Sequence, residues 1–302
     1  MNSVIEVRKL YKKYKNGTEA VREIDFVVKK GKVFAFLGPN GAGKTTTVEI
    51  LEGLRNKTSG EIYYFGKKIE TVSQEIKEKI GVVLQKTELM ELLTVKETIK
   101  LFSSFYKKSV PYKEIIETIN LKEKENSRIK GLSGGQNQRL AIGLALVNDP
   151  EIIFLDEPTT GLDPQARRKV WELIKELKAK GKSIFLTTHY MEEAENLADH
   201  VCIIDHGKII AEGSVEELIN KMSEDKSIIE FQIKNIKEGL ILPVGYRKFG
   251  DTFIVKTSNV TKTLSEIMGW AERNNIKLEK IEIHNPNLED LFIQLTGKEL
   301  RD

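Results

Sequence analysis

The sequence predicts an α/β protein built around a mostly parallel β-sheet, and three observations support this prediction. Short apolar runs that suit buried parallel strands lie at residues 32–37, 80–84, 152–155, 183–187 and 201–204. Segments with the apolar spacing of helices lie between them, such as residues 45–54 and 164–179. The chain has 302 residues, 40% of them hydrophobic, which is enough for a sizeable core. Alternation of strands and helices is typical of parallel α/β sheets.

The first part of the chain is expected to form one domain over residues 1–220. Two β-rich runs, residues 4–10 and 24–28, precede the first buried strand. A helix-rich stretch at about residues 86–150 follows the strand at 80–84 and is expected to form a helical subdomain. The alternation then resumes, and residues 208–213 are expected to complete the core as its last hairpin.

The pattern changes near residue 220. Residues 215–222 are polar and helical in spacing, which predicts a connector. Beyond it, strands are expected at residues 228–233, 252–255 and 277–283, and helices at 264–274 and 288–295. These elements predict a small α+β domain with its own apolar core over residues 221–302.

Composition excludes several classes of function. The net charge of +3 is too small to indicate a nucleic-acid partner, and none is expected. The single cysteine, Cys202, lies in an apolar run and is expected to be a buried thiol in a reducing compartment. No apolar stretch approaches the length of a membrane span, and the N-terminal residues lack the pattern of a signal peptide. Any membrane role is therefore expected to come through a partner.

A phosphate-binding loop follows the first buried strand. Gly38 and Gly43 are separated by four residues and followed by Lys44 and Thr45. Glycine permits the loop to direct backbone N–H groups at phosphates, and the following helix adds its positive end. Lys44 is expected to reach the β- and γ-phosphates of ATP, and the Thr45 hydroxyl to ligate Mg²⁺. A plain glycine-rich turn is the alternative, which the strand before and the helix after it disfavour. The predicted nucleotide-binding residues are Gly38, Pro39, Asn40, Gly41, Ala42, Gly43, Lys44, Thr45 and Thr46.

Two adjacent carboxylates, Asp156 and Glu157, end a buried strand. The carboxyl ends of parallel strands share one crevice, so both are expected near the phosphates. Asp156 is the expected partner of Mg²⁺ through water. Glu157 is the expected general base, polarising the water that attacks the γ-phosphorus. A strand exit into solvent is the alternative for this pair.

The most specific motif is Leu-Ser-Gly-Gly-Gln at residues 132–136. Its glycines precede an apolar-periodic helix, so backbone donors and a helix N-terminus are exposed there, and Ser133 adds a hydroxyl. These groups could bind a γ-phosphate, although the chain already has a phosphate loop. A Ser-Gly-Gly cap on a core helix is the alternative. With the phosphate loop and the paired carboxylates in this order, the chain resembles the ATPase subunit of an ABC transporter.

That resemblance implies a P-loop NTPase core of the ABC ATPase type, in which the signature of one subunit closes over ATP held by another. Ser133, Gly134, Gly135, Gln136 and Asp163 would then act across a dimer. The family places a glutamine that senses Mg²⁺ and the attacking water where Gln85 stands. It places a switch histidine that touches the γ-phosphate at His189, and an adenine-stacking aromatic at Tyr14, with Tyr11 as rival. The other histidines, His200, His206 and His284, are expected to be surface or packing residues.

The ending of the chain narrows the class. Residues 287–297 resemble the C-terminal ending of ATPases from bacterial drug-, antibiotic- and sodium-export systems. A ribosome-acting ABC protein would normally carry two cassettes in one chain. A DNA-repair or chromosome-structure ATPase would place a long coiled coil between Gln85 and Ser133, which are fewer than 50 residues apart. The resemblance therefore implies an exporter subunit that uses ATP and Mg²⁺ and pairs with a second ATPase subunit. It would attach to separate membrane-spanning subunits at the cytoplasmic face of the membrane, and those subunits would contact the cargo.

Overall fold

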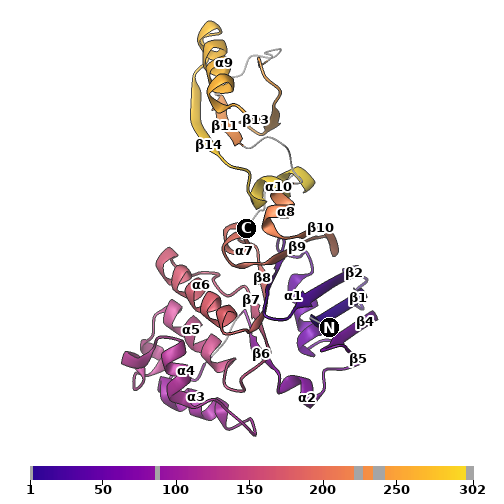
Figure 1. Ribbon diagram of the computed structural model, residues 1–302, viewed down its shortest axis with the longest axis vertical. Coiled ribbons are helices and arrows are strands. Elements are labelled where there is room, and N and C mark those ends of the chain that lie inside the picture. The colour runs from indigo at the N-terminus through magenta and orange to yellow at the C-terminus, as the bar shows by residue number, and fades with distance from the viewer. Residues whose placement is uncertain (1–2, 86–88, 221–226, 234–241, 297–302) are drawn as a thin grey trace. The chain divides into compact units, whose positions relative to one another are not determined.

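The computed structural model describes residues 3–85, 89–220, 227–233 and 242–296. The chain divides into two compact units, one of residues up to Val215 and the other from Glu216 to Glu299. Figure 1 shows the elements of both. The division lies at the start of helix α8 (Val215–Asn220), so most of the expected connector groups with the second unit. The rest of that connector lies outside the described residues.

A six-stranded sheet in the order β10-β9-β3-β8-β7-β6 forms the centre of the first unit. All neighbours from β9 to β6 run parallel, and β10 pairs antiparallel with β9. This confirms the predicted mostly parallel sheet. Its strands are β3 (Val33–Leu37), β6 (Ile80–Val83), β7 (Ile152–Asp156), β8 (Ser183–Thr188), β9 (His200–Asp205) and β10 (Lys208–Gly213).

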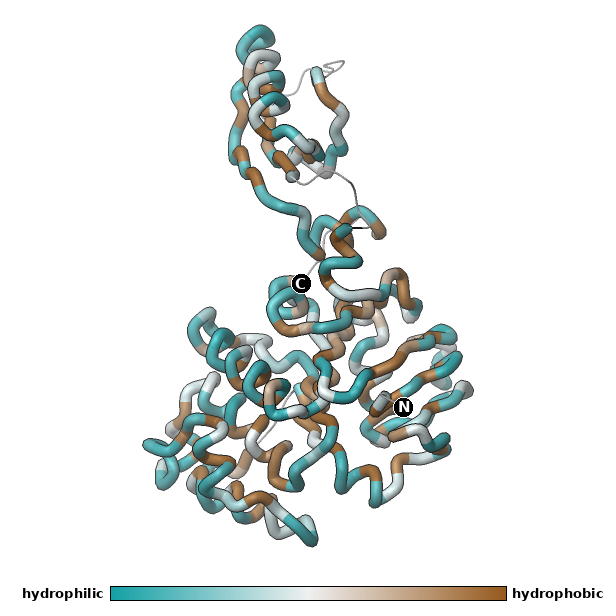
Figure 2. Tube along the Cα trace, in the orientation of Figure 1, coloured by the Kyte–Doolittle hydropathy of each residue, from teal (hydrophilic) through white to brown (hydrophobic). Residues whose placement is uncertain are grey.

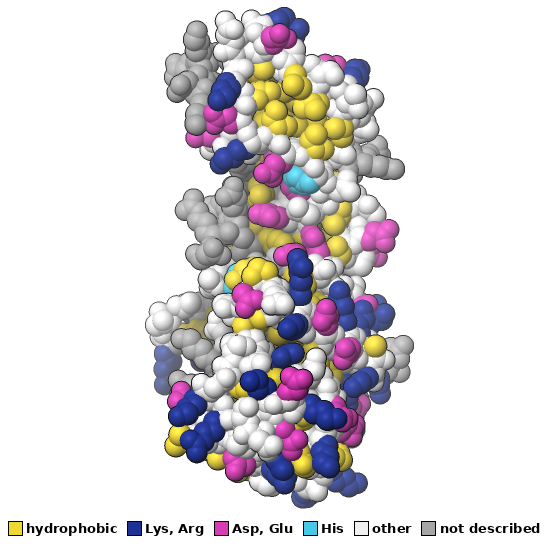
Figure 3. All heavy atoms as spheres, turned by 90° about the vertical axis from the view of Figure 1, so that its left-hand side faces the viewer, with side chains coloured by type: hydrophobic (Ala, Val, Ile, Leu, Met, Phe, Trp, Pro, Cys, Tyr) yellow, Lys and Arg dark blue, Asp and Glu magenta, His cyan; other side chains and the backbone are white. Residues whose placement is uncertain are grey.

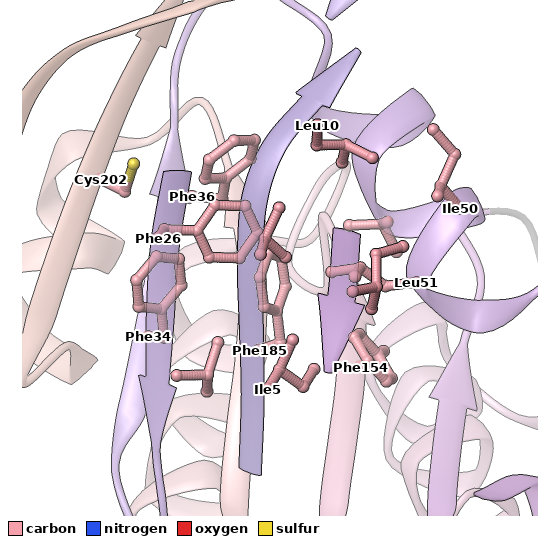
Figure 4. Packing of buried hydrophobic residues seen from close by; sticks show 14 of the residues in the cluster. Ile5, Leu10, Phe26, Phe34, Phe36, Ile50, Leu51, Phe154, Phe185 and Cys202 are labelled. Carbon is pink, nitrogen blue, oxygen red and sulfur yellow. The ribbon is translucent and has the colours of Figure 1, made fainter. Parts of the chain in front are cut away.

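A second, antiparallel sheet packs against the first. It has the order β2-β1-β4-β5, with β1 (Ser3–Lys13), β2 (Glu19–Lys29), β4 (Ser59–Tyr64) and β5 (Lys67–Ile69). The two sheets share one hydrophobic core in which Phe26 of β2 lies 5.3 Å, between ring centroids, from Phe34 of β3 and 6.0 Å from Phe185 of β8 (Figure 4). Cys202 is buried in this core, as predicted, and burial raises the pKa of its thiol. Figure 2 shows brown, hydrophobic stretches along these strands.

Helices cover the parallel sheet. Helix α1 follows the phosphate loop, and α3, α4 and α5 contact one another within the predicted helix-rich stretch. The Thr94–Glu97 capping box starts α3, since each side chain accepts a hydrogen bond from the other residue's backbone N–H. The helices are α1 (Lys44–Glu52), α2 (Gln74–Lys77), α3 (Val95–Ser103), α4 (Tyr112–Thr118), α5 (Gly134–Leu144), α6 (Pro164–Ala179) and α7 (Met191–Leu197), with 3₁₀ turns at Lys122–Lys124 and Ile129–Gly131. Among the described residues, none of the helices has both the length and the apolar character that a membrane span needs.

The second unit is an α+β unit with an antiparallel sheet in the order β12-β13-β11-β14. Helix α9 packs on one face of it, where Ile267 and Trp270 meet Phe231 and Phe253. The Asn259 side chain accepts a hydrogen bond from the Lys262 N–H, so α9 begins at Val260, four residues before the predicted start. The elements are β11 (Ser227–Ile233), β12 (Arg247–Phe249), β13 (Thr252–Thr257), α9 (Val260–Arg273), β14 (Leu278–His284) and α10 (Leu288–Thr296).

Glu52 is a buried carboxyl at the end of α1. Its side chain is 4% exposed, and neither carboxyl oxygen has a hydrogen-bond partner among the described residues. Burial, and then the charge of Asp156, raise the pKa of Glu52 to about 8. The group is therefore neutral in the folded protein at pH 7.

In the wild type, we expect the free energy of unfolding to fall as the pH rises, and we expect Glu52→Gln to remove this fall. An unfolded carboxyl loses its proton near its ordinary pKa of 4.5, whereas folded Glu52 keeps its proton up to about pH 8. The unfolded state therefore binds fewer protons between these values, and the free energy of unfolding decreases by an amount of the order of 5 kcal/mol. Urea unfolding across this pH range checks it. Glu75→Gln is the control, since Glu75 of α2 is an exposed glutamate that lies 3.9 Å from Lys79 in a surface ion pair. Parallel pH profiles for the wild type and Glu52→Gln would refute the prediction.

Candidate nucleotide-binding site

The loop between β3 and α1 requires glycine at both ends. A Cβ atom on Gly38 would lie 2.2 Å from the backbone oxygen of Ile204, and one on Gly43 would lie 2.3 Å from that of Ala20. Gly43 also has a φ of 107°, a backbone conformation that residues other than glycine rarely adopt. The loop thus follows a wholly buried strand and leads directly into the first turn of α1. This is the strand–loop–helix context that a phosphate loop needs.

Lys44 directs its ammonium group back across this loop. Its Nζ donates to the carbonyl oxygens of Gly38 (2.7 Å) and Pro39 (3.2 Å) and lies 3.4 Å from Oε1 of Glu157. The side chain is 4% exposed, and burial lowers the pKa of Lys44. Two carbonyls and a carboxylate therefore hold a buried cation at the place where phosphates are expected.

Thr187 of β8 fixes both predicted carboxylates. Its hydroxyl donates to Oδ1 of Asp156, and the backbone N–H of Glu157 donates to both Oγ1 (3.0 Å) and the carbonyl (3.1 Å) of Thr187. Burial raises the pKa of Asp156. Glu157 has a φ of 48°, a conformation that costs energy in any residue but glycine. This conformation is retained because Thr187 holds the backbone N–H of Glu157.

Four side chains of the site contact the Glu157 carboxylate. Oε2 accepts hydrogen bonds from Nε2 of Gln85 (3.0 Å) and the hydroxyl of Thr160 (3.3 Å). Oε1 lies 3.3 Å from Nδ1 of His189 and 3.4 Å from Nζ of Lys44. Burial alone would raise the pKa of Glu157, but the charges of Lys44 and His189 outweigh it and lower the pKa. The carboxylate is therefore charged at neutral pH and can accept a proton.

These partners come from the carboxyl ends of neighbouring strands. Lys44 follows β3, Gln85 follows β6, Glu157 follows β7 and His189 follows β8, which are consecutive in the sheet order β3-β8-β7-β6. The structure thus brings together four of the residues predicted from sequence. Thr45 is exposed in the first turn of α1, and Asp156 ends β7 beside Glu157.

The aromatic predicted for adenine lies next to α1. The Tyr14 hydroxyl is 3.0 Å from Oγ1 of Thr46. Cationic groups of Lys12 and Arg55 lie 5.3 Å and 5.2 Å from the centre of its ring. The rival, Tyr11, instead donates to Glu19 (2.8 Å). Of the two, Tyr14 is the one whose hydroxyl pairs with a phosphate-loop residue.

The signature residues start helix α5. Oγ of Ser133 accepts from the N–H of Gln136 (3.3 Å), and the N–H of Ser133 donates to Oε1 of Gln136 (2.9 Å). Asp163 caps α6 in the same way by accepting from Ala166 (2.9 Å). The two helix starts border a hollow of about 120 Å³. The structure describes the whole phosphate loop, and no residue of that loop lines this hollow. A close approach of α5 to α6 sets this arrangement, since a Cβ on Gly135 would lie 2.6 Å from that of Ala166.

Sequence reasoning missed the residues that support the site. Thr187 and Thr160 bond the two carboxylates, and the Thr-Thr run before His189 was a signal for the first of them. Glu193 of α7 is buried and accepts from the Thr159 hydroxyl (2.8 Å) and the Trp171 indole (3.0 Å). Glu193 therefore anchors the segment between Glu157 and Asp163.

Comparison with known proteins decides the family. A family model described as ABC transporter matches residues 21–160, and one described as AAA domain, putative AbiEii toxin, Type IV TA system, matches residues 128–193. The Nod factor export ATP-binding protein I of Cupriavidus pinatubonensis is 36% identical over an alignment covering 100% of this chain and 93% of that protein. The linearmycin resistance ATP-binding protein LnrL of Bacillus subtilis is 35% identical, with 93% of this chain and 95% of that protein covered. The chain belongs to the ABC transporter family.

Solved structures of the ABC family match the fold. A dimeric ATP-binding cassette, MJ0796, in a post-hydrolysis state with ADP and phosphate, has a TM-score of 0.62 and 30% identity over 70% of this chain and 98% of that chain. The ADP conformation of the cassette MJ1267 has a TM-score of 0.65 and 28% identity, covering 72% and 93%. The predicted ABC ATPase fold is thereby confirmed. The chain is an ATP-binding and ATP-hydrolysing subunit of an ABC transporter, which is favoured over a soluble ABC protein that acts on the ribosome or nucleic acid.

Proposed function

We propose that two copies of this ABC subunit, or one copy and a close paralogue, enclose two ATP molecules and drive membrane-spanning subunits. One observation carries the proposal: the Glu157 carboxylate is held by Lys44, Gln85 and His189, while the signature lines a separate hollow. A single nucleotide in one copy does not need both phosphate-binding devices. The dimeric state named for the similar cassette MJ0796 supports a second copy.

The residues around Glu157 support hydrolysis within each copy. Gln85 orients the attacking water, and Glu157 takes its proton as the water oxygen bonds to the γ-phosphorus and the bond to ADP breaks. Lys44 and His189 offset the charge on the γ-phosphate. The oxygen donors of Thr45, Gln85 and Asp156 fit Mg²⁺, which prefers such ligands. When bound, the ion neutralises phosphate charge.

The remaining site residues complete the sandwich. Tyr14 stacks on adenine, and the backbone donors of residues 38–46 bind the phosphates. Ser133, Gly134, Gly135, Gln136 and Asp163 contact the nucleotide of the partner. We assign residues 1–220 to ATP binding, with a helical subdomain at about 86–150, and residues 221–302 to an accessory domain.

The transport partner is a separate membrane-spanning subunit, to which this chain attaches at the cytoplasmic face of the membrane. The names of the relatives, Nod factor export and linearmycin resistance, support export as the direction. Large apolar side chains are exposed close in sequence to Gln85, namely Leu84 (45%), Met90 (64%) and Leu92 (71%). Exposed apolar side chains of this kind mark interaction sites, and we assign the docking of the membrane subunit to this region.

Substituting Ser133 by aspartate tests the shared site. Asp and Asn both cap helices as well as Ser, so neither Ser133→Asp nor Ser133→Asn should unfold α5. We expect both variants to bind ATP like the wild type, because Ser133 lies outside the cis site. Ser133→Asp should lower ATP turnover about 100-fold or more, since it sets a negative charge against the γ-phosphate of the partner. Steady-state hydrolysis and nucleotide titration measure both effects. Wild-type turnover in Ser133→Asp would mean that Ser133 is only a helix cap.

A further inference from the structure

A second group of ligand-type side chains lies in the second unit. Glu230 of β11, His284 at the end of β14 and Asp290 in the first turn of α10 each offer one ligand atom, and these atoms all lie within 4.8 Å of one another. Within the described part of the chain, no other group of three or more His, Cys, Asp or Glu side chains brings its ligand atoms this close together. Figure 3 shows acidic side chains gathered around a histidine on one face of this unit. The sequence suggested no partner for His284, because its neighbours come from elements distant in the chain.

Hydrogen bonds orient two of the three side chains. Nδ1 of His284 lies 2.9 Å from the backbone oxygen of Asn285, which can only accept, so Nδ1 carries the hydrogen. Nε2 lies 3.6 Å from Oε1 of Glu230, and Nδ1 also lies 3.7 Å from Oδ2 of Asp290. Oδ2 of Asp290 accepts from the N–H of Asn287 (2.8 Å), and Asn287 in turn accepts from the N–H of Asp290 (3.0 Å). Such outer hydrogen bonds are typical of histidine and carboxylate ligands in metal sites.

The surroundings are strongly acidic. The three side chains line a hollow of about 600 Å³ together with Glu282 and Glu289, and its described lining includes no Lys or Arg. Glu230 and Glu282 stand directly opposite each other on β11 and β14, a like-charge pair that disfavours the sheet unless a cation offsets it. Lys256 of β13 gives its Nζ to Oε1 of Gln294 (2.7 Å). Lys256 and Arg247 line the neighbouring hollow, which Asp290 also borders, whereas the described lining of the larger hollow holds four carboxyl groups, one imidazole and no Lys or Arg side chain.

We propose that Glu230, His284 and Asp290 bind a divalent transition-metal ion, for which Zn²⁺ is the probe. One imidazole nitrogen with two carboxylates suits such an ion, whereas Ca²⁺ and Mg²⁺ prefer oxygen ligands alone. Bonds of about 2.0–2.1 Å in a tetrahedral site place ligand atoms about 3.4 Å apart. The 3.6 Å between Nε2 of His284 and Oε1 of Glu230 is close to this spacing. The ion joins β11, β14 and α10, so it fixes α10 on the sheet.

Zinc titration of the nucleotide-free, chelator-treated full chain tests the proposal. In competition with a chromophoric chelator, we expect one tight Zn²⁺ equivalent in the wild type, unaffected by excess Mg²⁺. His284→Gln should lose this equivalent, and the near-isosteric Glu230→Gln should weaken its binding tenfold or more. The matched controls are His206→Gln, at an exposed histidine of the first unit, and Glu266→Gln, at an exposed glutamate of α9. Both should bind Zn²⁺ like the wild type.

A structural readout keeps the result independent of folding. Zn²⁺ should raise the melting temperature of the wild type and of both controls but not that of His284→Gln, because a ligand of the folded state alone stabilises it. X-ray absorption of the zinc complex should show one nitrogen ligand among oxygens. Equal Zn²⁺ stoichiometry and affinity in the wild type and His284→Gln would overturn the proposal. So would a wild type without saturable binding, which would make the cluster a protonated histidine between two carboxylates.

Discussion

Glu157→Gln should retain ATP binding and lose turnover by about 10²- to 10⁴-fold, the range that a general base contributes. The amide keeps the size of the carboxylate and can still pair with Gln85 and Thr160, so the geometry of the site is maintained. It has no basic oxygen to take the proton of the attacking water. The low pKa of Glu157 keeps that oxygen available in the wild type.

The measurement is steady-state hydrolysis at saturating ATP and Mg²⁺, beside a nucleotide titration of the same protein. Glu192→Gln is the matched control, because Glu192 is an exposed glutamate on α7 whose Oε2 lies 3.9 Å from Nη1 of Arg167. That variant should hydrolyse ATP at the wild-type rate. Turnover of Glu157→Gln within twofold of the wild type would refute the general-base role.

Lys44→Ala should lower both ATP affinity and the stability of the nucleotide-free protein. Removal of the ammonium group deletes charge-assisted bonds to phosphate, which are worth at least about a tenfold change in affinity. It also leaves the buried Glu157 carboxylate without its lysine partner, at a cost of up to about 3 kcal/mol in the free energy of unfolding. Nucleotide titration and urea unfolding separate the two effects.

The double variant Lys44→Ala/Glu157→Gln is the control for this interpretation. It removes both charges of the pair, so most of the lost stability should return while ATP affinity stays low. If the single and double variants were equally stable, the ion pair would not contribute to the fold. Unchanged ATP affinity in Lys44→Ala would contradict its role at the phosphates.

Local patterns predicted the elements of the site, and long-range packing determined the rest. The phosphate loop could be recognised because its glycines, Lys44 and Thr45 all lie within one short stretch, residues 38–45. The apolar runs likewise marked the strands of the parallel sheet. The strand order was not predictable, and it is this order that places Gln85 beside Glu157 across 72 residues. Strands β4 and β5 were missed, because β4 begins with Ser-Gly-Glu and β5 is only Lys-Lys-Ile, so neither shows an alternation of apolar and polar residues.

For single residues too, contacts with distant parts of the chain could not be predicted from the sequence. Ser133 was expected to serve a second copy, and within one copy its hydroxyl caps α5, which is compatible with either role. His284 was expected to be a surface or packing residue, yet it lies 3.6 Å from Glu230, a residue on a different strand. In both cases the residue type was informative, but its partners depend on the tertiary structure.

The central claim is that the signature of one copy completes the ATP site of another, and sedimentation of Glu157→Gln tests it most directly. With ATP and Mg²⁺, this variant should form a dimer, because ATP stays bound and unhydrolysed. Adding Ser133→Asn, which keeps the cap of α5 without a charge, should leave the dimer in place. Adding Ser133→Asp should keep the protein monomeric even at saturating ATP. A Glu157→Gln/Ser133→Asp protein that dimerises as readily as Glu157→Gln would contradict the claim.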